Sequence, residues 1–154
     1  MRTRGRFPVA AVALCMVLAG ACATKTSIDR TPAPPSSAEV AAPLVIDQFL
    51  RAANSNDLDT MARLFGNRDG SVLNRDDKEM VDRQMFALAS ILRHDSYSIA
   101  SSQIVPGRRD EATQINVSMK FGSREIVVPY TLVYSKAGTW LVEQIEITRI
   151  TGAR

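Results

Sequence analysis

The chain has 154 residues, and its 19 Lys and Arg against 16 Asp and Glu give a formal net charge of +3. Residues 1–21 contain three arginines and no acidic residue, so the remaining 133 residues hold 16 basic and 16 acidic side chains. The basic excess is therefore confined to one end of the chain, and it does not indicate the basic surface of a nucleic-acid-binding protein. A length of 133 residues is enough for one domain with its own hydrophobic core.

The N-terminal segment has the order of a secretory signal peptide. Three arginines lie within residues 2–6, an apolar run covers 9–18, and small residues occupy 19–21. Basic, apolar and small residues in that order are typical of a cleaved signal. The apolar run is shorter than the roughly 20 residues that a transmembrane helix needs.

Cys22 directly follows the small residues, in the sequence Leu-Ala-Gly-Ala-Cys at 18–22. This order resembles a bacterial lipoprotein signal, with Leu18 one position further from the cysteine than is usual there. The resemblance implies that Cys22 becomes the N-terminus and carries a diacylglyceryl thioether, usually with an amide-linked acyl chain. Two or more acyl chains anchor a protein stably. An ordinary signal peptide cleaved after Ala21, with Cys22 incidental, and an uncleaved anchor remain open alternatives.

Lipidation at Cys22 sets expectations for location and redox chemistry. Ala23, rather than an aspartate, follows the cysteine, and in enteric-type bacteria this favours export to the outer membrane. We therefore expect a lipid-anchored protein of the bacterial cell envelope that faces the periplasm. Cys15 would leave with the signal peptide, so no intramolecular disulfide is expected.

Residues 22–42 are rich in Pro, Ser, Thr and Ala. Few apolar side chains are present to offset the entropy of ordering, and the composition predicts a flexible tether. Twenty extended residues reach on the order of 60 Å.

Helical periodicity begins after the tether. Pro43 suits a first helical position, and apolar residues recur at three- and four-residue spacing up to Ala53. The polar run 54–57 predicts a break that caps a second helix, which Gly66 would terminate. A polar loop is expected over 66–75.

A third helix is expected, with apolar residues along one face up to Leu92. Asp76 and Glu79 have the spacing of a capping box at its start. Arg93 and His94 occupy its last turn, where cations and dipoles suit the helix C-terminus.

Beyond Asp95 the apolar period changes from 3.6 to two, which predicts strands. Pro129 within the third of them favours an edge strand or a bulge. The four expected strands cover 97–105, 112–121, 124–134 and 139–149.

The predicted fold class is α+β, with three N-terminal helices packed on a curved four-stranded antiparallel sheet over residues 43–150. Two stretches carry a family resemblance: Asn-Asp-Leu...Met-Ala-Arg-Leu-Phe at 56–65, after a first helix, and Gly-Thr-Trp-Leu-Val at 138–142. With this order of elements, the chain resembles the nuclear transport factor 2-like fold, or ketosteroid-isomerase-like cone. The resemblance implies a bent sheet that wraps around helices and leaves a cavity, with Trp140 packed under the sheet.

Candidate site residues are few. His94 is the single histidine, and we expect it to cap the helix rather than act as a general base. Cone-fold isomerases place Tyr and Asp in their cavity, but the pattern indicates no buried carboxylate here. The candidate ligand or partner contacts are Tyr97, Tyr130, Tyr134 and Trp140.

No cofactor is expected, and no metal, because the polar residues of 67–77 lack the alternate spacing of a calcium loop. Nothing resembles a nucleic-acid site.

Three classes of function remain open. The first is a non-catalytic envelope module that binds a small hydrophobic ligand, a peptide or a protein partner. The second is a structural lipoprotein that forms a homodimer through its sheet. The third is a cone-fold isomerase or hydrolase acting on a small hydrophobic substrate. The first class fits the strand faces best, because Gln114, Asn116 and Ser118 alternate with Ile115, Val117 and Met119, as expected for a sheet covered on one side.

Overall fold

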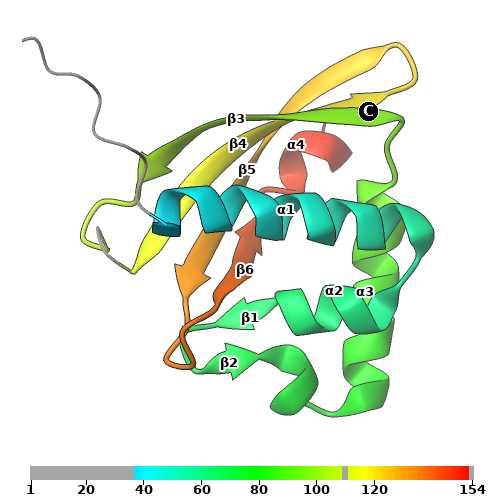
Figure 1. The fold of residues 1–154 in the computed structure, drawn as a ribbon. Helices are drawn as coiled ribbons and strands as arrows, with labels where there is room; N and C mark the ends of the chain where they lie inside the picture. Colours follow the sequence, from blue (N-terminus) through cyan, green and yellow to red (C-terminus); the bar gives the residue numbers. More distant parts are fainter. Residues whose placement is uncertain (1–36, 109–110, 153–154) are drawn as a thin grey trace, which may run out of the picture. The chain divides into compact units, whose positions relative to one another are not determined.

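The computed structural model describes residues 37–108 and 111–152, without the side chains of 37–40 and 101. The predicted signal peptide, Cys22 and most of the predicted tether lie outside these residues. The described part is an α+β domain, in which α1 crosses the sheet β3–β6 (Figure 1). Its elements in chain order are α1 (Ser37–Ser55), α2 (Leu58–Leu64), β1 (Gly66–Asn67), β2 (Gly70–Ser71), the 3₁₀ helix η1 (Val72–Asn74), α3 (Lys78–Leu92), β3 (Ser96–Ile104), β4 (Ala112–Phe121), β5 (Arg124–Tyr134), β6 (Trp140–Ile145) and α4 (Thr148–Thr151).

The first helix starts earlier than expected. α1 begins at Ser37, so Pro43 lies inside the helix and the end of the predicted tether is helical. A proline inside a helix loses one hydrogen bond and costs about 3 kcal/mol. Burial on both sides of the proline offsets this cost, because Ala42 and Ile46 are almost completely covered by the core. No described helix combines the length and apolar content needed to cross a membrane.

The junction between α1 and α2 is confirmed. The chain turns at Asn56, whose φ of 58° is left-handed, a conformation that asparagine tolerates better than most residues. Asp57 then caps α2, because its carboxylate accepts a hydrogen bond of 3.0 Å from the backbone N of Thr60.

The expected polar loop 66–75 is instead a short hairpin followed by η1. β1 and β2 pair antiparallel, with Gly66 opposite Ser71. Gly66 does not terminate α2, which ends at Leu64 with Phe65 as its C-cap. A Cβ at Gly66 would lie 2.3 Å from the carbonyl oxygen of Gly70, so glycine is required here for close approach of the two strands.

The predicted capping box at the start of α3 is also wrong by one residue. Asp77, not Asp76, is the N-cap, and its carboxylate accepts from the backbone N of Met80 at 3.1 Å. An N-cap side chain reaches the N–H two or three positions later. Both aspartates offer this chemistry, and only the backbone conformation selects between them.

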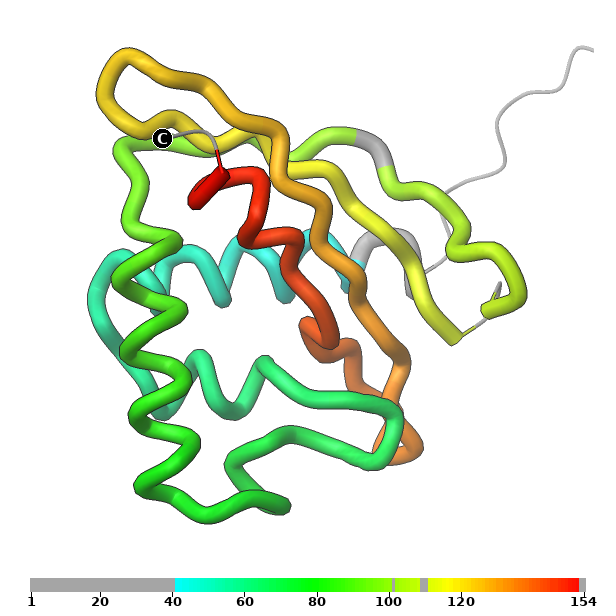
Figure 2. Tube along the Cα trace, turned by 180° about the vertical axis from the view of Figure 1, so that it is seen from behind, coloured from blue at the N-terminus to red at the C-terminus, as the bar shows by residue number. Residues whose placement is uncertain are grey.

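The main sheet has the order β3-β4-β5-β6, and each neighbouring pair is antiparallel. The predicted bounds of β4 and β5 are confirmed. β6 ends at Ile145, well before the predicted end at Arg149, and the chain continues into α4, which lies beside β5 (Figure 2).

Pro129 lies in β5, which is an interior strand rather than an edge. Its carbonyl accepts from the backbone N of Glu146 at 3.0 Å, so the side of the proline that lacks an N–H faces the chain just after β6 has ended. The pairing of β5 with β6 also shifts register between Thr131 and Leu132. The pairing of β5 with β6 begins at Tyr130, so the N–H that Pro129 lacks removes no hydrogen bond from that pairing.

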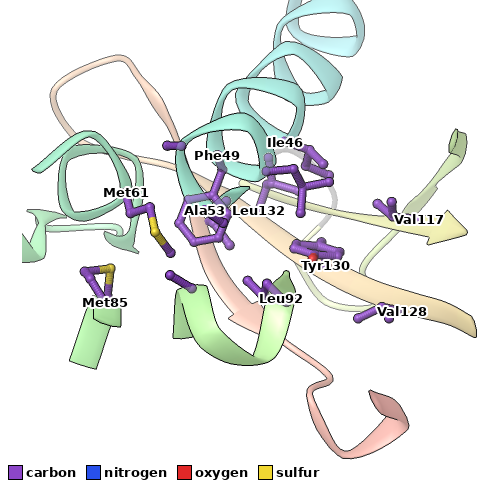
Figure 3. Close-up of a cluster of buried hydrophobic side chains, with 14 of the residues drawn as sticks. Ile46, Phe49, Ala53, Met61, Met85, Leu92, Val117, Val128, Tyr130 and Leu132 are labelled. Carbon is purple, nitrogen blue, oxygen red and sulfur yellow. The ribbon is translucent and has the colours of Figure 1, made fainter. Parts of the chain in front are cut away.

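The hydrophobic core lies between the helices and one face of the sheet (Figure 3). β5 contributes Val128, Tyr130 and Leu132 to it, and α1 contributes Ile46 and Phe49. Apolar and polar residues alternate along β4 because one face of the strand packs on this core while the other meets solvent.

Candidate functional site

On the inner face of the sheet, several large side chains of the described residues are fully covered. Ile115, Met119, Tyr130 and Leu132 from the sheet, and Phe49 from α1, are 0% exposed. A side chain with no accessible surface borders neither solvent nor an internal space that admits water. These residues, which would line a cone-like cavity, therefore pack against protein atoms.

Tyr130 is accordingly a core residue. Its hydroxyl donates to the Sδ of Met119 at 3.4 Å, and sulfur is a weak acceptor. Burial raises the pKa of Tyr130 well above its usual range, so the phenol stays protonated. This candidate contact is thus enclosed by the core.

Tyr97 lies at the edge of the core, beside α1. Its hydroxyl donates to Oδ1 of Asp47 at 2.5 Å, and Arg51 pairs with the other oxygen, Oδ2, at 2.9 Å. The hydrogen bonds from Tyr97 and Arg51 lower the pKa of Asp47, while burial first, and Asp47 second, raise the pKa of Tyr97. The pair therefore rests as carboxylate and phenol, and it is stabilised in that state rather than set for proton transfer.

His94 lies two residues beyond α3, which ends at Leu92, and not in the last helical turn as the sequence predicts. It is buried, and its Nδ1 donates to the carbonyl of Leu92 at 2.8 Å. The other ring nitrogen lies 3.3 Å from the side-chain amide of Asn54. Asn54 also binds the backbone N and O of His94. The ring of His94 thus fastens α3 to the end of α1.

Tyr134 and Trp140 lie together where β5 and β6 pair. Their ring centroids are 5.3 Å apart, and Tyr134 is 43% exposed. Trp140 packs against the core, and its buried Nε1 has no hydrogen-bond partner among the described residues. Of the four candidate contacts, Tyr134 alone presents much surface to solvent.

A pocket of about 440 Å³ lies at the end of the domain, where the hairpin β1–β2, η1 and the β5–β6 turn meet. We call it the end pocket. Its volume is within the range of roughly 300–1,000 Å³ that is usual for small-molecule sites. Its lining residues are Arg63, Asp69, Gly70, Ser71, Asn74, Arg75, Ser135, Ala137, Thr139 and Leu141.

Contacts between distant parts of the chain build this pocket. The backbone N of Lys136 donates to the carbonyl of Arg68 at 2.8 Å, and its Nζ pairs with Asp69 at 2.7 Å. Phe65, just before the hairpin, forms a parallel bridge with Val142 in β6. The hairpin is thereby fixed against the last strand of the sheet.

Ser71 is the unusual residue of the end pocket. It is only 9% exposed, and its hydroxyl has no hydrogen-bond partner in the described part of the chain. Ser135 and Thr139 differ, because their hydroxyls bind each other at 2.9 Å. A buried hydroxyl without a partner costs free energy, and in a native structure it calls for an explanation.

The charges of the pocket wall are mixed, with two guanidinium groups. Arg63 donates to the hydroxyl of Thr60 at 2.8 Å and forms no ion pair within the described ranges. Arg75 lies 3.5 Å from the carboxylate of Asp76, which is long for a charge-assisted bond. Asp69 pairs with Lys136, and that hydrogen bond lowers the pKa of Asp69.

The sequence pattern predicts neither the end pocket nor the contact between Tyr97 and Asp47. The end pocket joins residues 63–75 to 135–141, and the Tyr97–Asp47 contact spans fifty positions. The one sequence signal for the pocket was the length of the polar stretch 66–75, because long polar loops often carry contacts. Among the described residues, no three His, Cys, Asp or Glu side chains are grouped to hold a metal ion.

The chain matches no protein-family model and no curated protein. Similar solved structures include a nuclear transport factor 2-like protein of unknown function from Silicibacter pomeroyi, at 11% identity and a TM-score of 0.48, covering 72% of this chain and 96% of that one. Another is a provisionally assigned ketosteroid isomerase from Shewanella frigidimarina, at 14% identity and a TM-score of 0.44, covering 68% and 92%. A third is a phospholipid-binding protein from Ralstonia solanacearum in complex with a phospholipid, at 13% identity and a TM-score of 0.41, covering 71% and 77%.

Proposed function

We propose that this chain is a lipid-anchored protein of the bacterial envelope, and that its folded domain is a non-catalytic binding module which uses the end pocket. The observation that carries the binding role is the end pocket itself. It has the volume of a ligand site, and its wall carries two guanidinium groups with unused hydrogen-bonding capacity. Polar groups of this kind give small-molecule sites their specificity.

The anchor is proposed from the order of residues 2–22, in which basic, apolar and small residues precede Cys22. Because α1 begins at Ser37, the proposed tether shortens to residues 23–36, which reach about 45 Å if extended. That length separates a domain from the membrane surface. The proposed location is the outer membrane, with the domain in the periplasm.

Two observations favour binding over catalysis. The Tyr97–Asp47 pair is held by Arg51 with the carboxylate ionised and 31% exposed, whereas a general acid or base near pH 7 needs a carboxyl whose pKa is raised. The inner sheet face, where a cone-fold isomerase or hydrolase would hold a hydrophobic substrate, is covered by packed side chains. The proposed ligand site is therefore the end pocket and not the inner face of the sheet.

Lipidation is tested on the full chain by replacing Cys22 with Ala in a bacterial host. The native chain is expected in the membrane fraction with an acyl mass on its N-terminal peptide, and the variant is expected to leave that fraction. Membrane association of the variant, together with a native peptide of unmodified mass, would remove the anchor from the proposal.

The binding site is tested by titrating neutral, acidic and basic fragments into the isotope-labelled full chain in detergent. Fragment-induced shifts are expected to cluster on backbone resonances of the pocket wall, such as Ser135 and Thr139. Ala137→Trp fills the pocket from an exposed position and should abolish those shifts. Ala87→Trp, also at an exposed position but on α3, is the matched control. Shifts that cluster on Met119 and Tyr130 instead would return the site to the inner face.

The homodimer through the sheet stays a prediction. Val127 lies on the outer face, opposite in direction to Val128, and is 54% exposed. Sedimentation of the native chain should show a dimer that Val127→Asp dissociates, and a native monomer at all concentrations would end this part of the proposal.

A further inference from the structure

We infer that the end pocket binds a small organic monoanion through its carboxylate group. The inference rests on the proposed function, because it names the ligand class of the same pocket. Two features carry it: the two arginines of the wall and the carboxylate of Asp69.

The arginines supply the binding groups for an anion. A guanidinium group has five N–H donors in a planar fork, and it pairs with a carboxylate through two parallel hydrogen bonds. Arg63 donates to the neutral hydroxyl of Thr60, and Arg75 makes two long contacts with Asp76, each of 3.5 Å. Both guanidinium groups therefore retain donors for a carboxylate in the pocket.

Asp69 limits the charge of the ligand. Its hydrogen bond with Lys136 lowers its pKa, so the carboxylate is ionised at neutral pH. An ionised group on the pocket wall disfavours a second negative charge nearby. Phosphate monoesters carry about −1.5 to −2 charges at pH 7, and a carboxylate carries one. The wall also contains the apolar side chains of Ala137 and Leu141, which suit a short aliphatic group beside the carboxylate.

The experiment compares N-acetyl-alanine with its neutral amide and with inorganic phosphate, each titrated into the full chain in detergent. Binding is followed by calorimetry and by the backbone resonances of Ser135 and Thr139. We expect the acid to bind at least tenfold more tightly than either the amide or phosphate. Its affinity should fall as salt is raised, because the attraction is electrostatic.

Variants assign the selectivity to the two arginines. Arg63→Gln and Arg75→Gln are each expected to lower the affinity for the acid at least tenfold and to leave the affinity for the amide unchanged. Arg83→Gln is the matched control, because Arg83 is an exposed arginine on α3 that pairs with Glu79 outside the pocket. All variants replace exposed side chains, and unchanged resonances of the core confirm that each one is folded.

The possible results separate the two levels of the proposal. Equal affinity for acid and amide, tighter binding of phosphate, or no effect of both Gln variants would overturn the carboxylate inference. If fragments still cluster on the pocket wall in that case, the pocket remains the binding site with another ligand class. If neither fragments nor N-acetyl-alanine perturb the wall, both the inference and the proposed pocket fail.

Discussion

The hydrophobic core and the end pocket differ in how completely side chains fill them. In the core, side chains from α1, α3 and the sheet cover one another completely, and nearly all of them are apolar. In the end pocket, guanidinium, hydroxyl and carboxylate groups line a space that protein atoms leave empty. A filled core stabilises the fold by burial, whereas the pocket retains hydrogen-bonding capacity at the expense of stability. This contrast makes the pocket, rather than the sheet interior, the place to look for function.

The largest loss of stability is expected from a cavity in the core. Phe49→Ala removes a fully covered ring that stacks on Phe65, with centroids 6.2 Å apart. Truncation of a buried phenylalanine costs about 3 to 5 kcal/mol, and urea unfolding measures the loss. Leu44→Ala on the same helix is the control, because Leu44 is 57% exposed and should change stability by less than about 0.5 kcal/mol. Equal effects of the two variants would show that the core is not where the stability lies.

The next effect is expected at the hairpin. Gly66→Ala places a methyl group against the carbonyl of Gly70, and overpacking of this kind costs about 1 to 3 kcal/mol. The hairpin should open locally, so the backbone N–H of Val72, which donates to Phe65, should exchange with solvent faster. Unchanged exchange at Val72 would contradict the close approach at Gly66.

Ser71 should respond with the opposite sign. Ser71→Ala removes a buried hydroxyl that lacks a partner among the described residues, and stability should rise by about 1 kcal/mol. Thermal unfolding measures the gain. Thr139→Val is the comparison, because the hydroxyl of Thr139 is bound to Ser135 and its loss should lower stability. A destabilised Ser71→Ala variant would mean that the hydroxyl has a partner in the folded chain.

The smallest effect is a pH dependence at Asp47. Because the pKa of Asp47 is lowered in the folded state, this carboxylate stabilises the fold above its unfolded pKa of about 3.9. That contribution is lost as pH falls through the lower folded value. Asp47→Asn should therefore reduce stability at pH 7 by less than about 1 kcal/mol, and the difference should vanish at the acid end. Urea unfolding at several pH values checks the trend, and a difference that persists in acid would contradict it.

The sequence predicted the sheet better than the site. The bounds of β4 and β5 followed from alternation, because burial of one face forces a two-residue period over ten residues or more. Two-residue strands such as β1 and β2 are too short to show any period. Pro43 predicts a helix start because proline suits the first helical position, but α1 begins at Ser37 and includes the proline.

The end pocket was beyond prediction for a different reason. Lys136 and Asp69 meet across sixty-seven positions, and no local pattern reports such a contact. The four aromatic candidates rest on residue type, and the structure places Tyr130 in the core and Tyr97 on Asp47. Residue type alone does not distinguish an aromatic side chain that fills a core from one that binds a ligand.

The parallel bridge between Phe65 and Val142 has a consequence for the order of folding. Helices α1 and α2 and the hairpin form from neighbouring residues, but the pocket wall is complete only when the last strand of the sheet has paired. Contacts of such long sequence separation form late, because the chain between them must be ordered first. A ligand bound in the proposed end pocket would therefore recognise the finished domain and stabilise it against partly folded forms that lack β6.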